Sequence, residues 1–568
     1  MLSVKTASSV HFYQTLRLFN KITPFFRIFN VKNFEIKKNT HGQISTKELP
    51  VSFGIQNLST KSVLPAANKI LPALNMSEIR MEDERDEVAG LPPRFGYPTP
   101  VNCNLNNSGE WTKLSNGDRI WRLNIECEKA LSINLLYDKF WLPEGAKLFV
   151  YSQDKTKHIG AFTSVNNKGT EKEVRGFATG LIYSDKITLE YYVPNGVEQG
   201  IISIAYVVQG YRYINIAKST ESLGSSGACQ VNVNCTEGQN WQNEKNAVAL
   251  ILVNGIRWCS GSLVNTTAND ARPLFLTANH CLGGWANAVV HDAIDAPNLD
   301  LWSFYWNYEH PTCANSNVEP AIKSTSGAIV VANDSISDFA LLQLTENPSN
   351  RNDVNLYYLG WDGSGNAGTG GVGIHHPNGD VKKIATHNVT PTSNGNYWNL
   401  YWMQTQNGYS VTEGGSSGSP LLNNSHRVIG QLYGGSYINC SNPSNDLAMY
   451  GKFSVSWIGN GAPDNRRKLQ PWLDPDSTGI LVLNGCSGIV NFTNQTVTSD
   501  TTIVSCGDLN VQNITITNGA TLTLNAGNDI NIKEVYLLNG AKLILNAGGE
   551  ATIERDFDME LGTELEIN

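Results

Sequence analysis

The chain has 568 residues, enough for several domains that each bury a core of their own. Its formal net charge is −9 and only 16% of its residues are charged, so it lacks the positive field that binding to nucleic acid requires. The 51 glycines indicate a β-rich globular protein. No apolar run reaches the roughly 18 residues of a membrane span.

The first part of the chain, residues 1–48, is basic and has no convincing secretory signal. Polar or charged residues such as Arg17, Lys21 and Arg27 interrupt every apolar run there. Six of the ten cysteines lie in residues 229–440, at spacings that fit no C-x-x-C metal site, and they indicate disulfides and an oxidising compartment. These two observations conflict. A misassigned start, an atypical export route and, less favoured, an organelle transit peptide are the alternatives.

The next two segments are expected to form a pro-region. Residues 49–91 contain a linker and a short helix at about residues 77–87, whose charges are most simply a solvated face. Residues 92–218 alternate between strand patterns and turn signals such as Asn116-Gly117, which predicts an antiparallel β-sandwich. This segment carries no catalytic constellation.

Residues 219–485 contain three motifs that together indicate nucleophilic catalysis. His280 follows an apolar strand pattern, Asp338 begins another, and Ser417 lies in the glycine-rich turn of residues 413–420. Such a turn can present a serine hydroxyl and neighbouring N–H groups to one substrate atom. The turn alone could be an ordinary surface turn. With a histidine base and an orienting acid in the order His, Asp, Ser, the set predicts a catalytic triad.

Over about residues 226–485 the chain resembles the trypsin-like serine proteases, specifically the bacterial lysyl endopeptidase branch. Besides the triad, the resemblance is carried by residues 227–235, 261–270, 305–308, 374–378 and 428–432. Ser416 and Ser419 differ from trypsin itself but fit this branch. The resemblance implies a chymotrypsin-like double β-barrel, with the N–H groups of Gly415 and Ser417 as the oxyanion hole. It also implies the disulfides Cys229–Cys440, Cys235–Cys313 and Cys259–Cys281.

In that branch a buried aspartate two residues before a Tyr-Gly-basic run binds the substrate lysine, and this chain departs from the pattern. The run is Tyr450-Gly451-Lys452, Ala448 stands in the aspartate's position, and the nearest carboxylate is Asp446. Tyr433 replaces a histidine beside the pocket, and the tryptophan that lines it has no clear counterpart near residues 394–398. If the loop before Tyr450 shifts so that Asp446 reaches the pocket, selectivity for Lys or Arg is preserved. This alternative is favoured because self-cleavage in the loop of residues 217–227 would need a basic residue, and Lys218 lies there. If the loop does not shift, the pocket prefers apolar residues.

Two adjacent histidines, His375 and His376, suggest a metal pair. Neighbouring residues on a strand point to opposite faces, so a structural role is favoured. No metal and no cofactor is expected. Cys103 with Cys127, and Cys486 with Cys506, are candidate pairs on proximity alone.

The tail, residues 486–568, contains a repeat. Gly519, Gly540 and Gly562 recur every 21 or 22 residues, each before an alternating strand pattern, which predicts a small β-solenoid. It resembles the repeat tails of secreted bacterial hydrolases, which implies sorting machinery, surface attachment or substrate binding; a stabilising cap is equally admissible.

The whole chain is therefore expected to be an all-β, secreted serine endopeptidase that acts on proteins through an acyl-enzyme. It is made as a precursor whose pro-region serves as inhibitor or folding aid; a permanent binding domain is the alternative for that region. For the whole protein the alternative is an inactive protease fold that serves as a binding or adhesive surface protein, with the repeat tail as the working module.

Overall fold

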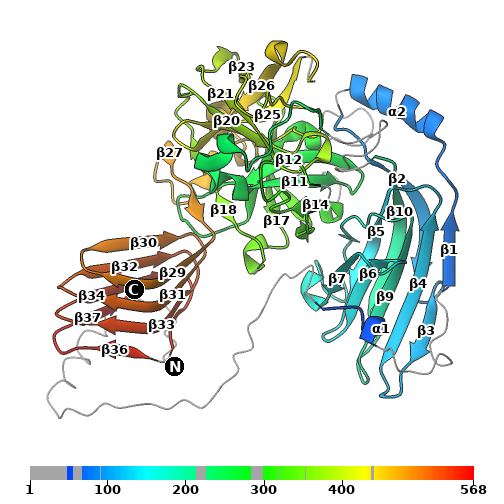
Figure 1. Cartoon of the computed structure of the whole chain (residues 1–568), viewed down its shortest axis with the longest axis horizontal. Coiled ribbons are helices and arrows are strands. Elements are labelled where there is room, and N and C mark those ends of the chain that lie inside the picture. The colour runs from blue at the N-terminus through cyan, green and yellow to red at the C-terminus, as the bar shows by residue number, and fades with distance from the viewer. Residues whose placement is uncertain are drawn as a thin grey trace. The chain divides into compact units, whose positions relative to one another are not determined.

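The computed structural model describes residues 48–54, 67–89, 91–212, 226–282, 299–316, 318, 320–351, 353–436, 440–554 and 556–568 (Figure 1). The basic segment before Glu48 and most of the loop around Lys218 lie outside these ranges. The described chain forms two compact units. One contains the residues up to 265 and residues 273–485, and the other contains residues 266–272 and 486–568.

The N-terminal part of the first unit is a sandwich of two β-sheets. One sheet has the order β1-β4-β9-β6-β7 with β3 on β4, and the other has the order β2-β10-β5-β8. Every pairing is antiparallel except that of β1 with β4, so the sandwich expected from the sequence is confirmed. The strands are β1 (Ala67–Leu71), β2 (Gly96–Asn104), β3 (Glu110–Lys113), β4 (Arg119–Cys127), β5 (Ser132–Trp141), β6 (Lys147–Ser152), β7 (His158–Phe162), β8 (Phe177–Ala178), β9 (Lys186–Val193) and β10 (Ile201–Gly210).

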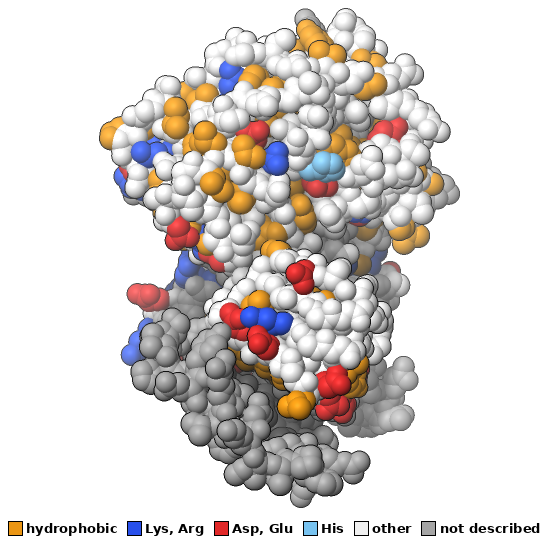
Figure 2. All heavy atoms as spheres, turned by 90° about the vertical axis from the view of Figure 1, so that its left-hand side faces the viewer, with side chains coloured by type: hydrophobic (Ala, Val, Ile, Leu, Met, Phe, Trp, Pro, Cys, Tyr) orange, Lys and Arg blue, Asp and Glu red, His pale blue; other side chains and the backbone are white. Residues whose placement is uncertain are grey.

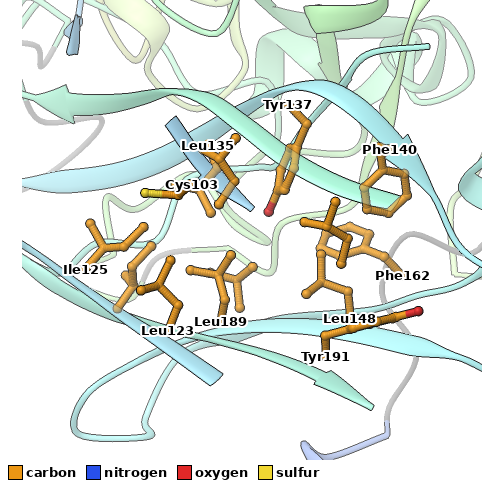
Figure 3. Packing of buried hydrophobic residues seen from close by; sticks show 14 of the residues in the cluster. Cys103, Leu123, Ile125, Leu135, Tyr137, Phe140, Leu148, Phe162, Leu189 and Tyr191 are labelled. Carbon is orange, nitrogen blue, oxygen red and sulfur yellow. The ribbon is translucent and has the colours of Figure 1, made fainter. Parts of the chain in front are cut away.

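The core of this sandwich lies between the two sheets (Figure 3). Leu123 and Ile125 of β4 are buried on the face of one sheet, against Leu135 and Tyr137 from β5 of the other. Strand β4 buries alternate residues because successive side chains point to opposite faces. Cys103 and Cys127 are both buried as free thiols, so the pairing suggested by their proximity in the sequence is wrong.

Two short helices accompany the sandwich, α1 (Val51–Gly54) and α2 (Met76–Val88). Helix α2 confirms the helix expected near residues 77–87, and of its side chains only Ile79 is buried. Its charges are not all a solvated face, however. Asp83 pairs with Arg94 and Arg212, and Asp86 pairs with Arg257, 171 residues away in the sequence.

The rest of the first unit contains two further sheets. The first has the order β15-β14-β11-β12-β13-β17-β16, with every pairing antiparallel. Its strands are β11 (Val248–Val253), β12 (Arg257–Leu263), β13 (Leu274–Ala278), β14 (Ser303–Tyr305), β15 (Ser324–Ser326), β16 (Ala328–Asp334) and β17 (Phe339–Leu344). All side chains of β11, β12 and β13 are buried, because both faces of these central strands are covered.

The second of these sheets has the main order β21-β20-β24-β25-β26-β23-β22, with β19 joining β25 to β27. Its strands are β19 (Gly360–Asp362), β20 (Gly371–His375), β21 (Lys383–His387), β22 (Thr392–Asn394), β23 (Tyr397–Tyr401), β24 (Pro420–Asn423), β25 (Arg427–Ser436), β26 (Leu447–Lys452) and β27 (Val482–Leu483). Disulfides join Cys229 to Cys440, Cys235 to Cys313 and Cys259 to Cys281, the same pairs that the resemblance implies. Together the two sheets give the expected chymotrypsin-like fold.

The second unit is a β-solenoid of parallel strands. One sheet stacks β29-β31-β33-β35, with β36 also on β33, and the other stacks β30-β32-β34-β37. Equivalent residues of successive repeats pair, as Leu522 does with Leu543, so the repeat is confirmed. The strands are β29 (Ile489–Val497), β30 (Thr501–Ser505), β31 (Asp508–Ile516), β32 (Thr521–Ala526), β33 (Ile530–Leu537), β34 (Lys542–Ala547), β35 (Ala551–Ile553), β36 (Phe557–Met559) and β37 (Glu564–Ile567).

The recurring glycines of the solenoid occupy its turns. Gly519, Gly540 and Gly562 have φ values of 71°, 72° and 95°, a left-handed conformation that a side chain would strain. The expected Cys486–Cys506 disulfide is present at the start of this unit. In Figure 2 the face that the solenoid presents carries mostly uncharged side chains, with acidic and basic ones in small groups.

Candidate active site

Adjacent strands bring His280 and Asp338 together. His280 lies in the 3-10 turn Asn279–Cys281 that directly follows β13, and Asp338 directly precedes β17. Because β13 and β17 pair with Ala278 opposite Phe339, the two side chains meet at one end of the sheet. Asp338 Oδ2 lies 2.7 Å from His280 Nδ1, and Asp338 Oδ1 accepts the backbone N–H of His280 at 2.9 Å.

This contact determines the charge and tautomer of the histidine. Burial lowers the pKa of His280, but the charge of Asp338 and its hydrogen bond raise it by more, so the pKa lies above the ordinary 6.5. When Nδ1–H donates to Asp338, the neutral ring carries its lone pair on Nε2. His280 can then accept a proton at Nε2 while Asp338 stabilises the resulting positive ring.

Ser417 lies in a turn that hydrogen bonds hold against the sheet containing β12. The N–H of Ser260 on β12 donates to the Ser417 carbonyl at 2.8 Å, and the Ser260 hydroxyl donates to the Gly415 carbonyl at 2.9 Å. Gly418 has φ = 83°, and a Cβ there would lie 2.2 Å from Thr277 Oγ1. This residue must be glycine because β13 passes so close to the turn. The described residues contain no hydrogen bond to the Ser417 hydroxyl itself.

Two N–H groups of this turn are available to a ligand. The N–H of Ser416 is bonded to the Glu413 carbonyl and that of Gly418 to the Leu432 carbonyl. Between and beside them, the N–H groups of Gly415 and Ser417 have no acceptor within the described part of the chain. These two donors are the ones expected to form the oxyanion hole.

The adjacent histidines have separate, buried environments. His375 Nδ1 lies 2.7 Å from the Ser416 hydroxyl, and His376 Nδ1 lies 2.9 Å from the Asp380 carbonyl. Burial lowers the pKa of both rings, that of His375 to about 3. The described residues contain no group of three or more His, Cys, Asp or Glu that could hold a metal ion. Through Ser416, His375 instead holds the turn that carries Ser417.

Asp446 is a buried carboxylate beside that turn. Its side chain is 0% exposed, and within the described ranges neither of its oxygens has a hydrogen-bond partner. Burial, and to a smaller extent the charge of Glu413, raise its pKa to about 7. It also lies beside β25, because a Cβ on Gly435 would be 3.4 Å from Asp446 Oδ1. Ala448 pairs with Gly435 and is fully buried.

Two tyrosines line the site next to His280. Tyr433 is 44% exposed, and its ring meets that of His280 edge-on with 6.1 Å between centroids. Tyr397 packs against Tyr433 at 5.1 Å. Tyr433 was named from the sequence as a residue beside the pocket, whereas Tyr397 was not assigned a place there. Strand alternation could have found it, because the neighbouring Trp398 is buried and Tyr397 must therefore face the other way.

The two sheets, antiparallel apart from the pairing of β19 with β25, have the fold of the chymotrypsin-like serine proteases. Residues 223–451 match the family model described as lysyl endopeptidase, C-terminal domain. The lysyl endopeptidase of Pseudomonas aeruginosa is 27% identical over 381 residues, which are 61% of this chain and 77% of that protein. The chain is thus a homologue of lysyl endopeptidase, a serine endopeptidase.

Solved structures similar to this chain include two other proteases. A Glu endopeptidase in complex with MPD is 19% identical with a TM-score of 0.26, covering 42% of this chain and 97% of that one. The serine endoprotease from Yersinia pestis is 14% identical with a TM-score of 0.26, covering 39% of this chain and 63% of that one.

Proposed function

We propose that this protein hydrolyses peptide bonds through a triad of His280, Asp338 and Ser417, and that it cleaves after basic residues. The observation that carries the proposal is the 2.7 Å contact between Asp338 and His280 Nδ1, next to a glycine turn with two unused N–H donors. Each group has one role in acyl transfer.

The proposed reaction proceeds in two halves. The Ser417 hydroxyl oxygen attacks the scissile carbonyl while its proton passes to His280 Nε2, and the N–H groups of Gly415 and Ser417 bind the oxyanion. His280 then gives that proton to the leaving amine as the C–N bond breaks. Water, deprotonated by His280, hydrolyses the resulting ester in the same way and regenerates the Ser417 hydroxyl.

The environment of Asp446 supports a preference for Lys or Arg. A buried carboxylate without a partner is costly, and a bound ammonium or guanidinium would supply the missing charge and hydrogen bonds. Asp446 lies beside Gly435 near the end of β25, and the charge of Glu413, the first residue of the serine-bearing turn, contributes to raising its pKa. The similar protein of P. aeruginosa bears the name lysyl endopeptidase, which agrees with this preference.

The remaining parts of the chain have proposed roles as well. The N-terminal sandwich is a pro-region that is removed on maturation, and the disulfides fit a secreted protein. The solenoid serves sorting or surface attachment. No described helix is long and apolar enough to cross a membrane.

The function is tested by protein hydrolysis. The purified chain should degrade denatured casein, whereas Ser417→Ala should not. Ser425→Ala is a matched control, because Ser425 is an exposed serine eight positions further on. If Ser417→Ala retains activity within tenfold of the unchanged chain, the assigned nucleophile is wrong.

A further inference from the structure

A short segment of the pro-region forms an extra strand at the end of β12. The N–H of Phe95 donates to the Ile256 carbonyl at 2.8 Å, and the N–H of Trp258 donates to the Pro93 carbonyl at 3.1 Å. Arg94 and Arg257 form an antiparallel bridge between these two bonds. Residues 93–95 therefore bind to the protease part as an extended peptide binds to a sheet edge.

Side chains reinforce this pairing. Arg257 donates from Nη1 to the Pro92 carbonyl at 2.7 Å and pairs through Nη2 with Asp86 of α2 at 2.5 Å. The rings of Phe95 and Trp258 stack with 5.3 Å between centroids, and both are fully buried. A partly buried, hydrogen-bonded ion pair and an aromatic stack give the contact specificity as well as stability.

This extra strand lies next to the serine-bearing turn. Trp258 is two residues before Ser260, which bonds to the carbonyls of both Gly415 and Ser417. A Cβ placed on Gly414 would be 3.2 Å from Pro93 Cγ, so Pro93 lies directly beside the turn. Asp446 lies on the side of this turn formed by β25 and β26. Residues 93–95 lie on the side formed by β12.

The path of the chain before residue 93 argues against binding as a substrate. In the proposed reaction the residue whose carbonyl is attacked fills the pocket at Asp446, so the residues after the scissile bond lie on the β12 side. Residues 93–95 occupy that side. Upstream, however, the Leu91 N–H bonds to the Asp86 carbonyl at 3.0 Å, so the chain turns into α2 instead of continuing as an extended strand.

We propose that residues 92–95 block the leaving-group side of the active site in the uncut chain, and that this is how the pro-region inhibits the protease. Removal of the pro-region then frees the edge of residues 256–258 for the substrate residues that follow the scissile bond, with Trp258 as their aromatic contact. This inference rests on the proposed function. It adds that residues 92–95 do not compete with a short ligand that ends on the Asp446 side of the turn.

Peptide binding to the Ser417→Ala full-length chain, which cannot process itself, tests this. One probe is a fluorescent four-residue peptide that ends in lysine. The other is the same peptide extended by four residues beyond the lysine. In Ser417→Ala the extension should change Kd by less than about twofold. With Asp86→Asn and Phe95→Ala added, which remove the ion pair and the stack, the extended peptide should bind about tenfold more tightly, roughly 1.4 kcal/mol.

Glu87→Gln is the control, because Glu87 is exposed on the same helix and the change removes the same charge. It should behave like Ser417→Ala alone. The inference is overturned if the extension already tightens binding in Ser417→Ala. It is also overturned if the variant with Asp86→Asn and Phe95→Ala added unfolds cooperatively but binds the extended peptide no more tightly than the short one. Binding of neither peptide by any variant would contradict the proposed function, and this inference with it.

Discussion

Asp338 accepts two hydrogen bonds from His280, one from the ring at 2.7 Å and one from the backbone N–H at 2.9 Å. The two bonds fix both the position and the tautomer of the imidazole. They occur because His280 follows β13 and Asp338 directly precedes β17, and these two strands pair, so residues 58 positions apart in the sequence are in direct contact.

Asp338→Asn is expected to lower kcat/KM by about 10⁴, because the amide can no longer hold the tautomer that leaves Nε2 free. The fold should persist, since asparagine has the same shape. Steady-state kinetics with a short amide substrate measure the loss, and circular dichroism controls for folding. A loss of less than tenfold would show that Asp338 does not orient the base.

The same contact predicts the pH dependence of the unchanged enzyme. His280 accepts a proton only when neutral, and its pKa lies above 6.5. The value of kcat/KM should therefore rise with pH through a midpoint above 6.5. Because folding raises this pKa, the stability from the ion pair is present below the unfolded value and is lost as pH rises through the folded one. A kinetic midpoint below 6.5 would contradict this assignment.

Asp446→Asn should remove the preference for basic residues. This carboxylate lies beside Gly435 of β25 and directly before β26. Without it, a lysine ammonium bound there has no counter-charge. We expect selectivity for lysine over leucine to fall by at least about 100-fold, the equivalent of nearly 3 kcal/mol. New termini in a digested, denatured protein mixture report it. Cuts mainly after apolar residues in the unchanged enzyme would contradict the assignment.

The same substitution should stabilise the folded protein at alkaline pH. The pKa of Asp446 rises from 3.8 to about 7 on folding, so the unfolded chain releases this proton first, and stability falls between about pH 4 and pH 7. The Asp446→Asn variant does not lose stability in this way, so its free energy of unfolding should exceed that of the unchanged protein by about 1–3 kcal/mol at pH 8 but by little at pH 4. Thermal unfolding at the two pH values measures the difference. Equal effects at both would show that Asp446 ionises normally.

The Cys259–Cys281 bridge should matter for activity as well as stability, because Cys281 directly follows His280. Replacing both cysteines by alanine should cost about 3 kcal/mol of unfolding free energy in the chain-entropy model and lower kcat/KM. The matched control is replacement of Cys486 and Cys506, which are bridged in the solenoid unit, and it should leave kcat/KM unchanged. Free thiols at positions 259 and 281 in the purified protein would reject the bridge.

The sequence predicted the fold well, because the fold is encoded in local patterns, and the triad stays a prediction. A turn rich in glycine and strands with apolar runs are visible without the structure. Pairings between distant residues are not. The contact of Asp86 with Arg257 joins residues 171 positions apart, and the charges of α2 therefore looked like a solvated face. The position of Asp446 was equally hard to predict. It depends on the path of the loop between Cys440 and β26, which no sequence motif specifies.

The central claim is that Ser417 is a nucleophile activated by His280. Treatment with a serine-directed phosphonate, followed by peptide mapping by mass spectrometry, tests it most directly. The account predicts covalent modification of Ser417 in the processed protein, with a rate at least about 100-fold lower in His280→Ala. Processed protein that remains unmodified at Ser417, or is modified equally fast without His280, would contradict it.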